Sequence, residues 1–291
     1  MTQNFQTKPL LHLRDLASSY DVIFSDIWGV VHNGIAAYAE ACAALAQFRE
    51  QGGKVVLISN APRPYWSVME QLDRLGAPRT TYDGVVASGD VTHELALQQP
   101  VARCYHIGAA HDEHLFRDLP VARTGMEEAS FIICSGLRND ESETAEDYRA
   151  ELEALAKRNL PMICANTDLV VERGTKLIAC AGALAVVYES LGGTIMQAGK
   201  PYTRIYEKTL AKAESLLGRQ ADKTRILAIG DAIRTDVVGA RGFGVDCLFL
   251  TAGIHSYEIH NSAGQIDGTK LSAFMAASDA QPTAVMRNLV W

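Results

Sequence analysis

The sequence predicts an α/β protein: a core with a doubly wound parallel sheet, and a second α/β domain inserted into that core. Short apolar runs that suit strands buried on both faces alternate with segments of helical spacing, as in βαβ units. Polar residues directly follow several of these runs, where ligands bind in open α/β sheets. The alternation restarts near residue 93. We therefore expect the core at residues 1–92 and 194–291 and the inserted domain at residues 93–193.

Each expected core element has its own local signal. Val22, Ile23 and Phe24 form a short apolar run typical of a buried strand. Ala41, Leu45 and Phe48 recur at helical spacing, with glycines directly after the helix. The expected core strands are residues 22–24, 54–59, 84–88, 194–198, 225–229 and 245–251. The expected core helices are 10–19, 38–51, 65–75, 202–217 and 236–242, and residues 255–270 are expected to form a surface loop with a short helix.

The inserted segment repeats the same alternation. Its expected strands are residues 103–107, 131–134 and 162–165, and its expected helices are residues 111–118, 144–159 and 177–191. Acidic residues precede and open the second of these helices, where they complement the helix dipole. A solvated helix start is therefore a sufficient explanation for that acidic cluster.

Composition and charge exclude several classes of function. The chain has 291 residues, of which 48% are hydrophobic and 21% charged, as in an ordinary globular protein. Its formal net charge is −7, whereas nucleic acids and anionic membranes attract clustered Lys and Arg. We therefore expect neither nucleic acid nor a membrane as a partner.

The six cysteines favour a reducing compartment. None forms a Cys-x-x-Cys pair, and most lie inside apolar runs, where a free thiol behaves as a small hydrophobic group. Neither a zinc site nor a disulfide framework is expected. The first residues also lack the apolar core of a signal peptide, and no run approaches 18 apolar residues. These features predict a cytoplasmic protein.

Four polar residues follow four separate apolar runs: Asp26, Ser59, Lys200 and Asp231. A parallel sheet brings the carboxyl ends of its strands to one edge, so these side chains are expected to converge. Together they supply carboxylates, a hydroxyl donor and a cation. Enzymes that transfer phosphoryl groups use these kinds of side chain, because their catalysis consists mostly of positioning and charge stabilisation. A plain strand-ending aspartate is the alternative at position 26.

The turn after the first strand suits a metal ion. Gly29 permits a sharp turn, so the backbone carbonyls of residues 27 and 28 are able to face the same point as Asp26. Mg²⁺ prefers carboxylate and carbonyl oxygens as ligands. Mg²⁺ held by Asp26 and Asp231 would also offset the repulsion between the two carboxylates.

Four ordered segments of the chain resemble the four motifs of the haloacid dehalogenase (HAD) superfamily. They are Asp26-Ile27-Trp28-Gly29-Val30, Ser59-Asn60, Gly199-Lys200-Pro201 and Gly230-Asp231-Ala232-Ile233-Arg234-Thr235-Asp236. The resemblance implies a Rossmann-like core with an inserted α/β cap. The Gly-Lys-Pro form of the third motif is similar to class IIA, the NagD-like branch. That branch includes p-nitrophenyl phosphatases, nucleotide and sugar phosphatases, phosphoglycolate phosphatase and pyridoxal phosphate phosphatase.

The resemblance implies a phosphoric monoester hydrolase with assigned groups for the substrate. Asp26 attacks phosphorus and becomes an aspartyl phosphate. Ser59, with the backbone of Asn60 and Ala61, hydrogen-bonds the transferring phosphoryl group, and Lys200 bridges that group and Asp26.

The resemblance also implies a Mg²⁺ site. Its ligands are Asp26, the backbone carbonyl of Trp28 and Asp231. Asp236 supports the site from outside, through a metal-bound water.

Trp28 departs from the family pattern. Family phosphatases usually carry a second aspartate two residues after the nucleophile, which protonates the leaving oxygen and then activates water. An indole cannot exchange protons in this way, and such help is worth about 10²–10⁴-fold. Activity is therefore expected to be weakened or redirected. His32 is near enough in sequence to act as a substitute acid, although a histidine that faces solvent or caps the loop is the alternative.

Several residues of the inserted domain and its flanks are candidates for substrate contact. The segment Asn166-Thr167-Asp168 follows an expected strand, and the caps of the family place such a loop over the site. Asn166 and Asp168 are therefore expected to bind substrate. Arg173 and Lys176 would attract an anionic substrate tail or form ordinary surface charge, and Arg63 would help phosphate or stabilise a loop. The histidines at positions 93, 106, 111 and 114 lack the spacing of a metal site.

We conclude from the sequence that the chain is a Mg²⁺-dependent phosphatase acting on a small phosphorylated metabolite. Sugar phosphates and nucleotides are the candidate substrate classes, and a homodimer is a possible assembly in this family. A dehalogenase is the weaker enzymatic alternative, because dehalogenation needs no metal and Asp231 is retained. A degenerate relative that binds a phosphorylated metabolite as a sensor or partner protein is the alternative from another class.

Overall fold

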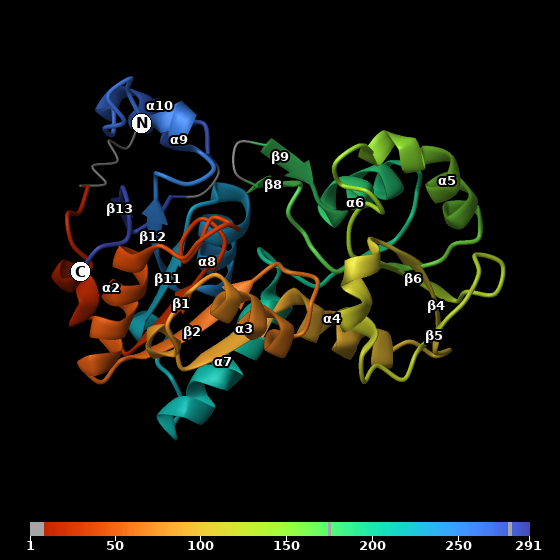
Figure 1. Cartoon of the computed structure of the whole chain (residues 1–291), viewed down its shortest axis with the longest axis horizontal. Coiled ribbons are helices and arrows are strands. Elements are labelled where there is room, and N and C mark those ends of the chain that lie inside the picture. Colours follow the sequence, from red (N-terminus) through yellow and green to blue (C-terminus); the bar gives the residue numbers. More distant parts are fainter. Residues whose placement is uncertain (1–8, 174–175, 279–280) are drawn as a thin grey trace. The chain divides into compact units, whose positions relative to one another are not determined.

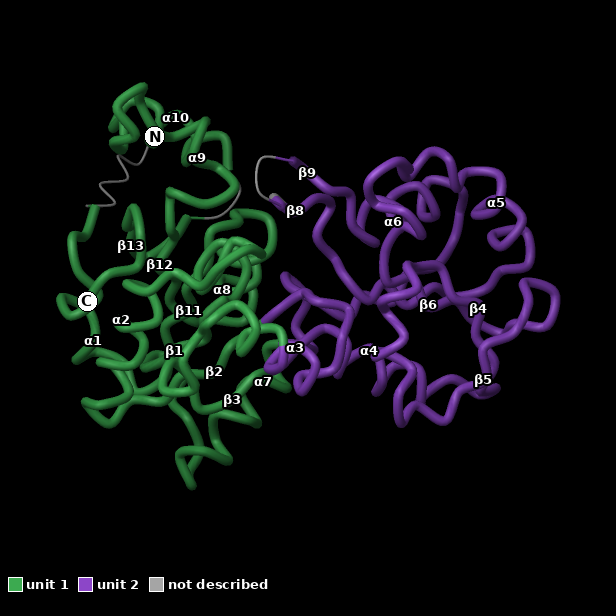
Figure 2. Tube along the Cα trace, viewed as in Figure 1, with its two compact units in different colours: residues 1–58, 71–85, 206–291 green, residues 59–70, 86–205 purple. Residues whose placement is uncertain are grey.

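A computed structural model describes residues 9–173, 176–278 and 281–291 of the chain (Figure 1). The expectation about a signal peptide falls on residues 1–8, which lie outside the described residues. The chain divides into two compact units (Figure 2). Unit 1 comprises residues 1–58, 71–85 and 206–291, and unit 2 comprises residues 59–70 and 86–205. The boundaries expected for the inserted domain, 93–193, remain a prediction.

The core is a six-stranded sheet in the order β13-β12-β11-β1-β2-β3 (Figure 1). The registers of β1 with β2 and β11, and of β12 with β11 and β13, are all parallel. The chain order reverses between β1 and β11, and ligands bind beyond the carboxyl ends of strands at such a switch point. The strands are β1 (Val22–Ser25), β2 (Lys54–Ser59), β3 (Gly84–Ala87), β11 (Ile226–Gly230), β12 (Asp246–Leu250) and β13 (Ala284–Met286).

The central core strands form because their residues are apolar on both faces. Every residue of β1 and β11 is buried, as the continuous apolar runs predict for a sheet covered on both sides. The helices α2 (Ala39–Glu50), α3 (Tyr65–Arg74) and α8 (Val238–Phe243) follow β1, β2 and β11, and α1 (Arg14–Ala17) precedes β1. Helix α7 (Thr203–Leu217) follows residues 195–197. The strand expected there was assigned to the core sheet, which is wrong, because it pairs in the second sheet. The predicted doubly wound parallel fold is confirmed.

Unit 2 has its own five-stranded sheet, in the order β10-β7-β6-β4-β5, and every neighbouring pair is parallel. Tyr148, Leu152, Leu155 and Tyr188 are buried in the core of this unit. Its strands are β4 (Arg103–Ile107), β5 (Ala122–Arg123), β6 (Phe131–Cys134), β7 (Met162–Cys164) and β10 (Ile195–Gln197). Its helices are α4 (Ser88–Leu97), α5 (Arg149–Lys157) and α6 (Ala181–Ser190), with a 3₁₀ helix at Ala110–Phe116.

The helix expected at residues 177–191 is wrong at its start. β8 (Val170–Arg173) and β9 (Lys176–Ala179) form an antiparallel pair, and α6 begins only after Cys180. A short apolar run such as Leu177-Ile178 suits either element, and pairing with the β-branched residues of β8 decides in favour of the strand.

The end of the chain contains more structure than the sequence predicted. Residues 255–270, expected to be a loop with a short helix, contain α9 (Ser256–Ile259) and the start of α10 (Gly268–Ala276). Strand β13 was not expected at all. This strand has only three residues, which are too few for the sequence to indicate a strand. Its pairing with β12 stabilises it.

Two further predictions are addressed by the structure. All six cysteines are buried and free, as expected. Across the described ranges, we find no helix with both the length and the apolar character that crossing a bilayer requires.

Candidate active site

Asp26 lies at the carboxyl end of β1, where that strand meets β11. Its backbone N–H donates to the carbonyl of Ile229 at 2.8 Å, which continues the pairing of the two strands by one residue. Its carboxylate Oδ1 accepts a hydrogen bond from the N–H of Ile27 at 2.7 Å. The side chain is 8% exposed. The strand end and the following turn therefore fix Asp26 in a buried position at the edge of the sheet.

Asp231 occupies the equivalent position after β11, and two backbone segments lie close to it. The N–H of Ile254 donates to its Oδ2 at 3.0 Å. An ideal Cβ at Gly29 would lie 2.1 Å from this oxygen, and one at Gly253 would lie 1.9 Å from it. The absence of a side chain at both glycines is what allows the two loops to approach the carboxylate.

Asp236 folds back onto the end of β11 from the turn of π-helix at Ile233–Val237. Its Oδ2 accepts a hydrogen bond from the N–H of Ala232 at 3.1 Å. An ideal Cβ at Gly230 would lie 2.1 Å from its Cγ, so Asp236 also packs against a glycine. The Gly-Asp segment at the end of β11 thus makes room for two carboxylates.

Asp26, Asp231 and Asp236 together form a carboxylate cluster. One oxygen from each lies within 4.8 Å of the others, and all three residues are buried. Like charges in a buried site repel one another, and a divalent cation is the ordinary way to offset that repulsion. Carboxylate oxygens at this spacing are the donors that Mg²⁺ prefers. The cluster therefore fits the metal that the sequence predicts, and it brings Asp236 as close as the two expected ligands.

Trp28, His32 and Gly34 form the turn beside this cluster. The rings of Trp28 and His32 meet edge to face, with centroids 5.1 Å apart. An ideal Cβ at Gly34 would lie 2.7 Å from the indole, so the indole covers this glycine. The side chain of His32 is 2% exposed, and its Nδ1 accepts a hydrogen bond from the N–H of Gly34 at 3.0 Å. His32 therefore caps the loop, which is the alternative that the sequence left open.

The other predicted site residues come together in unit 2, around Asn60. The side-chain Oδ1 of Asn60 accepts from the backbone N–H of Lys200 at 2.7 Å. Its Nδ2 donates to Oδ1 of Asp168 at 2.9 Å and to the carbonyl of Lys200 at 3.3 Å. Ser59 Oγ accepts from the N–H of Ala61 at 3.2 Å. The second motif, the third motif and the loop after β7 are thus joined by one amide side chain.

Hydrogen bonds also fix the conformation of the loop after β7. The side chain of Asn166 accepts a hydrogen bond from the N–H of Asp168 at 3.0 Å. The hydroxyl of Thr167 donates to the carbonyl of Lys200. An ideal Cβ at Gly199 would lie 2.5 Å from Asn60 Oδ1, so the glycine before Lys200 is needed for this contact. Lys200 itself is 2% exposed.

Arg173, which was expected either to attract substrate or to form surface charge, lies in a surface ion pair. Arg173 pairs with Asp140 at 2.7 Å on the surface, so its charge is already balanced. Burial raises the pKa of the Cys164 thiol to about 12, and burial likewise raises the pKa of the Cys180 thiol. Both thiols beside the loop after β7 therefore stay neutral and unreactive.

Two contacts in this region were not predicted from the sequence. Asn60 was expected to contribute only its backbone, and Thr167 was named only as part of the segment Asn166-Thr167-Asp168, without a role of its own. Their partners lie more than 100 residues away for Asn60 and more than 30 away for Thr167. The only relevant signal in the sequence was that both residues follow apolar runs.

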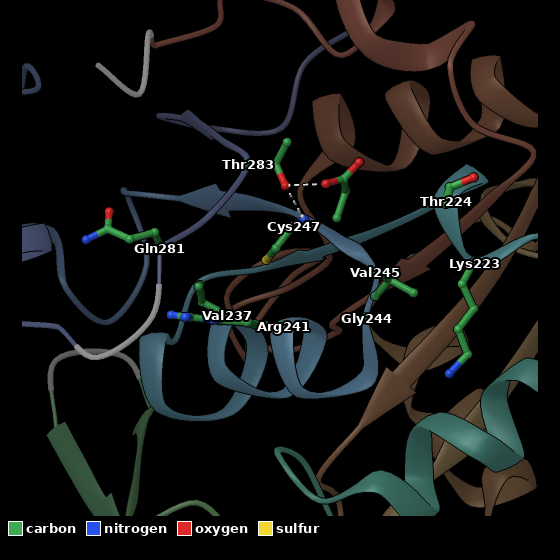
Figure 3. A pocket seen from close by; sticks show the side chains of 10 residues that line it. Lys223, Thr224, Val237, Arg241, Gly244, Val245, Cys247, Gln281 and Thr283 are labelled. Atoms are coloured by element: carbon green, nitrogen blue, oxygen red, sulfur yellow. Dashed lines mark hydrogen bonds between the residues drawn. The ribbon is translucent and has the colours of Figure 1, made fainter. Parts of the chain in front are cut away.

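A separate cavity of about 440 Å³ opens at the other edge of the core sheet, where β11 and β12 begin (Figure 3). Several of its polar groups are engaged within the fold. Thr283 donates to Asp246 at 2.7 Å and accepts from the N–H of Cys247 at 3.1 Å. Lys223 lies 3.5 Å from the ring centroid of Phe243. This cavity is therefore distinct from the carboxylate cluster, which lies at the carboxyl edge.

Comparison with known proteins agrees with this geometry. Models of haloacid dehalogenase-like hydrolases match residues 23–121 and 197–289. The crystal structure of a hydrolase of the haloacid dehalogenase-like family from Brucella suis 1330 is 45% identical. It covers 97% of this chain and 100% of its own, with a TM-score of 0.87. The chain belongs to the haloacid dehalogenase-like hydrolases. The family predicted from the four motifs is confirmed.

Two further proteins are similar to this HAD chain. A D-glycerol 3-phosphate phosphatase of Mycobacterium tuberculosis is 26% identical over 84% of this chain. The match spans 66% of that relative, just under two thirds of its length. NagD from Escherichia coli K-12 has the same fold, with a TM-score of 0.65 at 18% identity and coverage of 92% of this chain and 96% of its own. The NagD-like prediction is thus matched at the level of the fold.

Proposed function

We propose that this HAD protein is a Mg²⁺-dependent phosphatase that hydrolyses a small phosphate monoester, with Asp26 as the nucleophile. The buried cluster of Asp26, Asp231 and Asp236 carries the proposal, because three carboxylates at this spacing call for a divalent cation. The D-glycerol 3-phosphate phosphatase among the relatives supports the substrate class, a small phosphorylated metabolite.

Asp26 supplies the first chemical step. One carboxylate oxygen attacks phosphorus while the bond between phosphorus and the leaving oxygen breaks, and the leaving alcohol takes a proton from solvent. Water then attacks the phosphorus of the aspartyl phosphate, which releases phosphate and restores the carboxylate. The hydrogen bond from Ile27 to Oδ1 supports this role, since it orients the carboxylate.

Asp231, Asp236 and the backbone carbonyl of Trp28 complete the proposed metal site with Asp26. A bound Mg²⁺ supplies positive charge that stabilises the transferring phosphoryl group. The protein contributes the shape of the site: the glycines at positions 29, 230 and 253 admit the carboxylates, and Ile254 fixes Asp231.

Lys200, Ser59, Asn60 and Ala61 bind the phosphoryl group in this proposal. The ammonium of Lys200 balances phosphoryl charge, and Ser59 donates its hydroxyl. The side chain of Asn60 has a positioning role, because its amide is occupied by Lys200 and Asp168. Asn166 and Asp168 face the leaving group from the loop after β7.

Trp28 favours leaving groups that depart without being protonated. The indole supplies no proton to the leaving oxygen, and His32 caps its own loop. A leaving group that is stable as an anion, such as p-nitrophenolate, is therefore favoured over a sugar alkoxide.

Hydrolysis of p-nitrophenyl phosphate tests the proposal. We expect turnover with Mg²⁺, loss of turnover with EDTA, and loss in Asp26→Asn, which keeps the shape of the side chain and removes its charge. Asp222→Asn, an exposed aspartate before β11, serves as the matched control and is expected to keep full activity.

The competing function is a sensor that binds a phosphorylated metabolite without turnover, and Trp28 is the observation in its favour. Mg²⁺-dependent binding of phosphorylated metabolites by calorimetry, with no release of phosphate from any of them, would establish that function instead. Turnover that persists in Asp26→Asn would remove Asp26 as the nucleophile.

A further inference from the structure

The loop at residues 251–256, directly after β12, lies against the carboxylate of Asp231. The N–H of Ile254 donates to Oδ2 of Asp231 at 3.0 Å. An ideal Cβ at Gly253 would lie 1.9 Å from the same oxygen, so the backbone is as close to the carboxylate as a glycine allows. The position of this carboxylate therefore depends on the conformation of the loop.

The same loop makes a second contact with the fourth motif. Nε2 of His255 accepts a long hydrogen bond from the N–H of Ile233 at 3.5 Å. Nδ1 of His255 lies 2.7 Å from the carboxylate of Glu258, so Nδ1 carries the ring proton and Nε2 is the acceptor. Ile233 begins the π-helical turn that contains Asp236. The loop thus contacts the segments of both carboxylates that follow β11.

The two ends of this loop are anchored in different ways. At its start, the N–H of Thr251 donates to the carbonyl of Met286 at 2.9 Å, which continues the pairing of β12 with β13. At its other end, the loop passes into α9, a single turn of helix that begins at Ser256. Such a short helix is not stable by itself. The end at Ser256 therefore depends on contacts with other residues.

The buried imidazole of His260 joins the two ends of the loop. Its Nε2 lies 2.9 Å from the hydroxyl oxygen of Thr251, and its Nδ1 lies 3.1 Å from the hydroxyl oxygen of Ser256. Thr251 is 0% exposed and His260 is 7% exposed. Each ring nitrogen thus has a hydroxyl partner, one at each end of the loop.

The surroundings keep this imidazole neutral. Burial, followed by the charges of Arg287 and Lys270, lowers the pKa of His260 below its ordinary value. A neutral imidazole has one donor and one acceptor nitrogen, so one hydroxyl donates to the ring and the other accepts from it. The backbone of His260 is fixed as well, because its carbonyl accepts from Nζ of Lys270 at 2.7 Å. The ring is therefore a firmly held bridge between the two hydroxyls.

We propose that His260 is a positioning residue for the metal site: it bridges Thr251 and Ser256, holds the loop of residues 251–256 against Asp231, and so sets the affinity for Mg²⁺. Residues that orient metal ligands are typically worth about 10–100-fold in metal affinity. This inference rests on the proposed function, because it names what orients one carboxylate of the proposed metal site. His260 acts through the loop and contacts neither substrate nor metal.

Calorimetric Mg²⁺ binding by the whole chain tests the inference. We expect His260→Phe, which keeps an aromatic ring and removes both ring nitrogens, to raise the Kd for Mg²⁺ about 10-fold. Thr251→Val removes the hydroxyl at nearly constant shape and should also weaken Mg²⁺ binding. Thr251→Ser retains the hydroxyl and should bind Mg²⁺ nearly as tightly as the wild type.

The double variant of His260→Phe with Thr251→Val distinguishes a shared bridge from two independent effects. Both substitutions break the same hydrogen bond, so we expect the Kd of the double variant to exceed that of His260→Phe by less than about twofold. An increase equal to the product of the two single increases would contradict the bridge.

Hydrogen exchange at the Ile254 amide, measured without Mg²⁺, reports on the loop directly. We expect protection of this amide to fall about 10-fold in His260→Phe, relative to the amides of β12 in the same variant. Tyr20→Phe is the matched control, because it removes the hydrogen bond of another buried ring, from the Tyr20 hydroxyl to Asp246 at 2.8 Å. Asp246 begins β12 at the amino edge of the core sheet, so this control should change neither Mg²⁺ affinity nor Ile254 protection.

A folded His260→Phe protein that binds Mg²⁺ as tightly as the wild type overturns this inference, and so does an equal loss of affinity in Tyr20→Phe. If His260→Phe does not fold, Ser256→Ala decides by the same two measurements, with an expected rise in Kd of about threefold because it removes one hydrogen bond. In both cases, Mg²⁺-dependent turnover by the wild type leaves the proposed function standing. A wild type that binds no Mg²⁺ overturns the proposed metal site, and this inference with it.

Discussion

Gly29 and Asp231 are so close that no side chain fits between them. The ideal Cβ position at Gly29 lies 2.1 Å from Oδ2 of Asp231, and the backbone at Gly29 has a φ of +83°. The turn after β1 and the carboxylate after β11 are therefore fitted to one another. The first and fourth motifs approach each other this closely because the third residue after Asp26 is a glycine.

Gly29→Ala is expected to disrupt the carboxylate cluster. The alanine must push Asp231 aside, and a displacement of about 1 Å in a catalytic group costs on the order of 100-fold in rate. Steady-state hydrolysis of p-nitrophenyl phosphate and calorimetric Mg²⁺ binding measure the two consequences.

Gly76→Ala is the control for backbone strain. Gly76 has nearly the same φ, +84°, but nothing lies within 4 Å of its ideal Cβ. Both variants carry a conformational cost of about 1 kcal/mol. Equal activities in the two variants would show that the contact with Asp231 does not matter.

The charge arrangement around Asn60 gives a second prediction. Asn60→Asp removes the N–H that Asp168 accepts and places two carboxylates 2.9 Å apart. We expect a loss of about 1–3 kcal/mol in the free energy of unfolding, because the partly buried carboxylate of Asp168 loses its donor and faces a second carboxylate. Urea denaturation of the whole chain measures this loss.

Exchanging the amide and the carboxylate between positions 60 and 168 is expected to restore the lost stability. In the double variant Asn60→Asp with Asp168→Asn, an amide again donates to a carboxylate, and much of the stability should return. Asn33→Asp controls for the substitution itself, since the side-chain oxygen of Asn33 accepts hydrogen bonds from Ile35 and Ala36, as a carboxylate also would. A double variant no more stable than Asn60→Asp would exclude this pairing as the cause.

The parts of the fold that the sequence predicted are those with a local cause. Apart from Ser25, the residues of β1 and β11 are apolar because both faces of these strands are buried. Asp26 and Asp231 were predicted as site residues because strand ends in a parallel sheet share an edge. In contrast, Leu177-Ile178 suited a helix as well as a strand, and only pairing with β8 decided between them.

The parts that the sequence did not predict depend on contacts between distant residues. No local pattern indicates that the amide of Asn60 holds Lys200, or that Ser135 links His106 to Asp112. His106 was considered only as a metal ligand, because a histidine's neighbours in sequence do not reveal its tautomer. Such networks form when strands from separate parts of the chain end side by side.

Asp21 provides a prediction about pH. The hydrogen bond from Arg225 at 2.6 Å, then that from Arg219 at 2.7 Å, lowers the pKa of Asp21 to about 2. Because the folded pKa lies below the unfolded value of about 3.9, ionised Asp21 stabilises the fold above pH 4. This stabilisation is lost as the pH falls from 4 towards 2.

Asp21→Asn should therefore destabilise the protein by about 1 kcal/mol at pH 7, a modest value because solvent screens both arginines. The difference between the urea midpoints of the variant and the wild type is expected to narrow steadily as the pH falls from 4 towards 2. Asp15→Asn, at an exposed carboxylate of α1, controls for the loss of a negative charge. A difference that stays constant between pH 7 and pH 2.5 would contradict the assignment to this ion pair.

Trp28 is the position where activity should be easiest to raise. Its indole lies over Gly34 and edge to face with His32, and it holds no proton that a leaving oxygen accepts. A carboxylate at this position restores general acid–base help, which is typically worth about 10²–10⁴-fold. We expect Trp28→Asp to raise kcat for a sugar phosphate about 100-fold, the lower end of that range, because the turn is packed around an indole.

The expected gain depends on the leaving group, which makes the prediction specific. p-Nitrophenolate departs without a proton, so its hydrolysis should rise far less than that of the sugar phosphate in the same variant. Trp28→Phe removes the indole without adding a proton donor and should leave the ratio of the two rates unchanged. If Trp28→Asp raises both rates equally, the indole limits access to the site, and proton transfer does not limit the reaction.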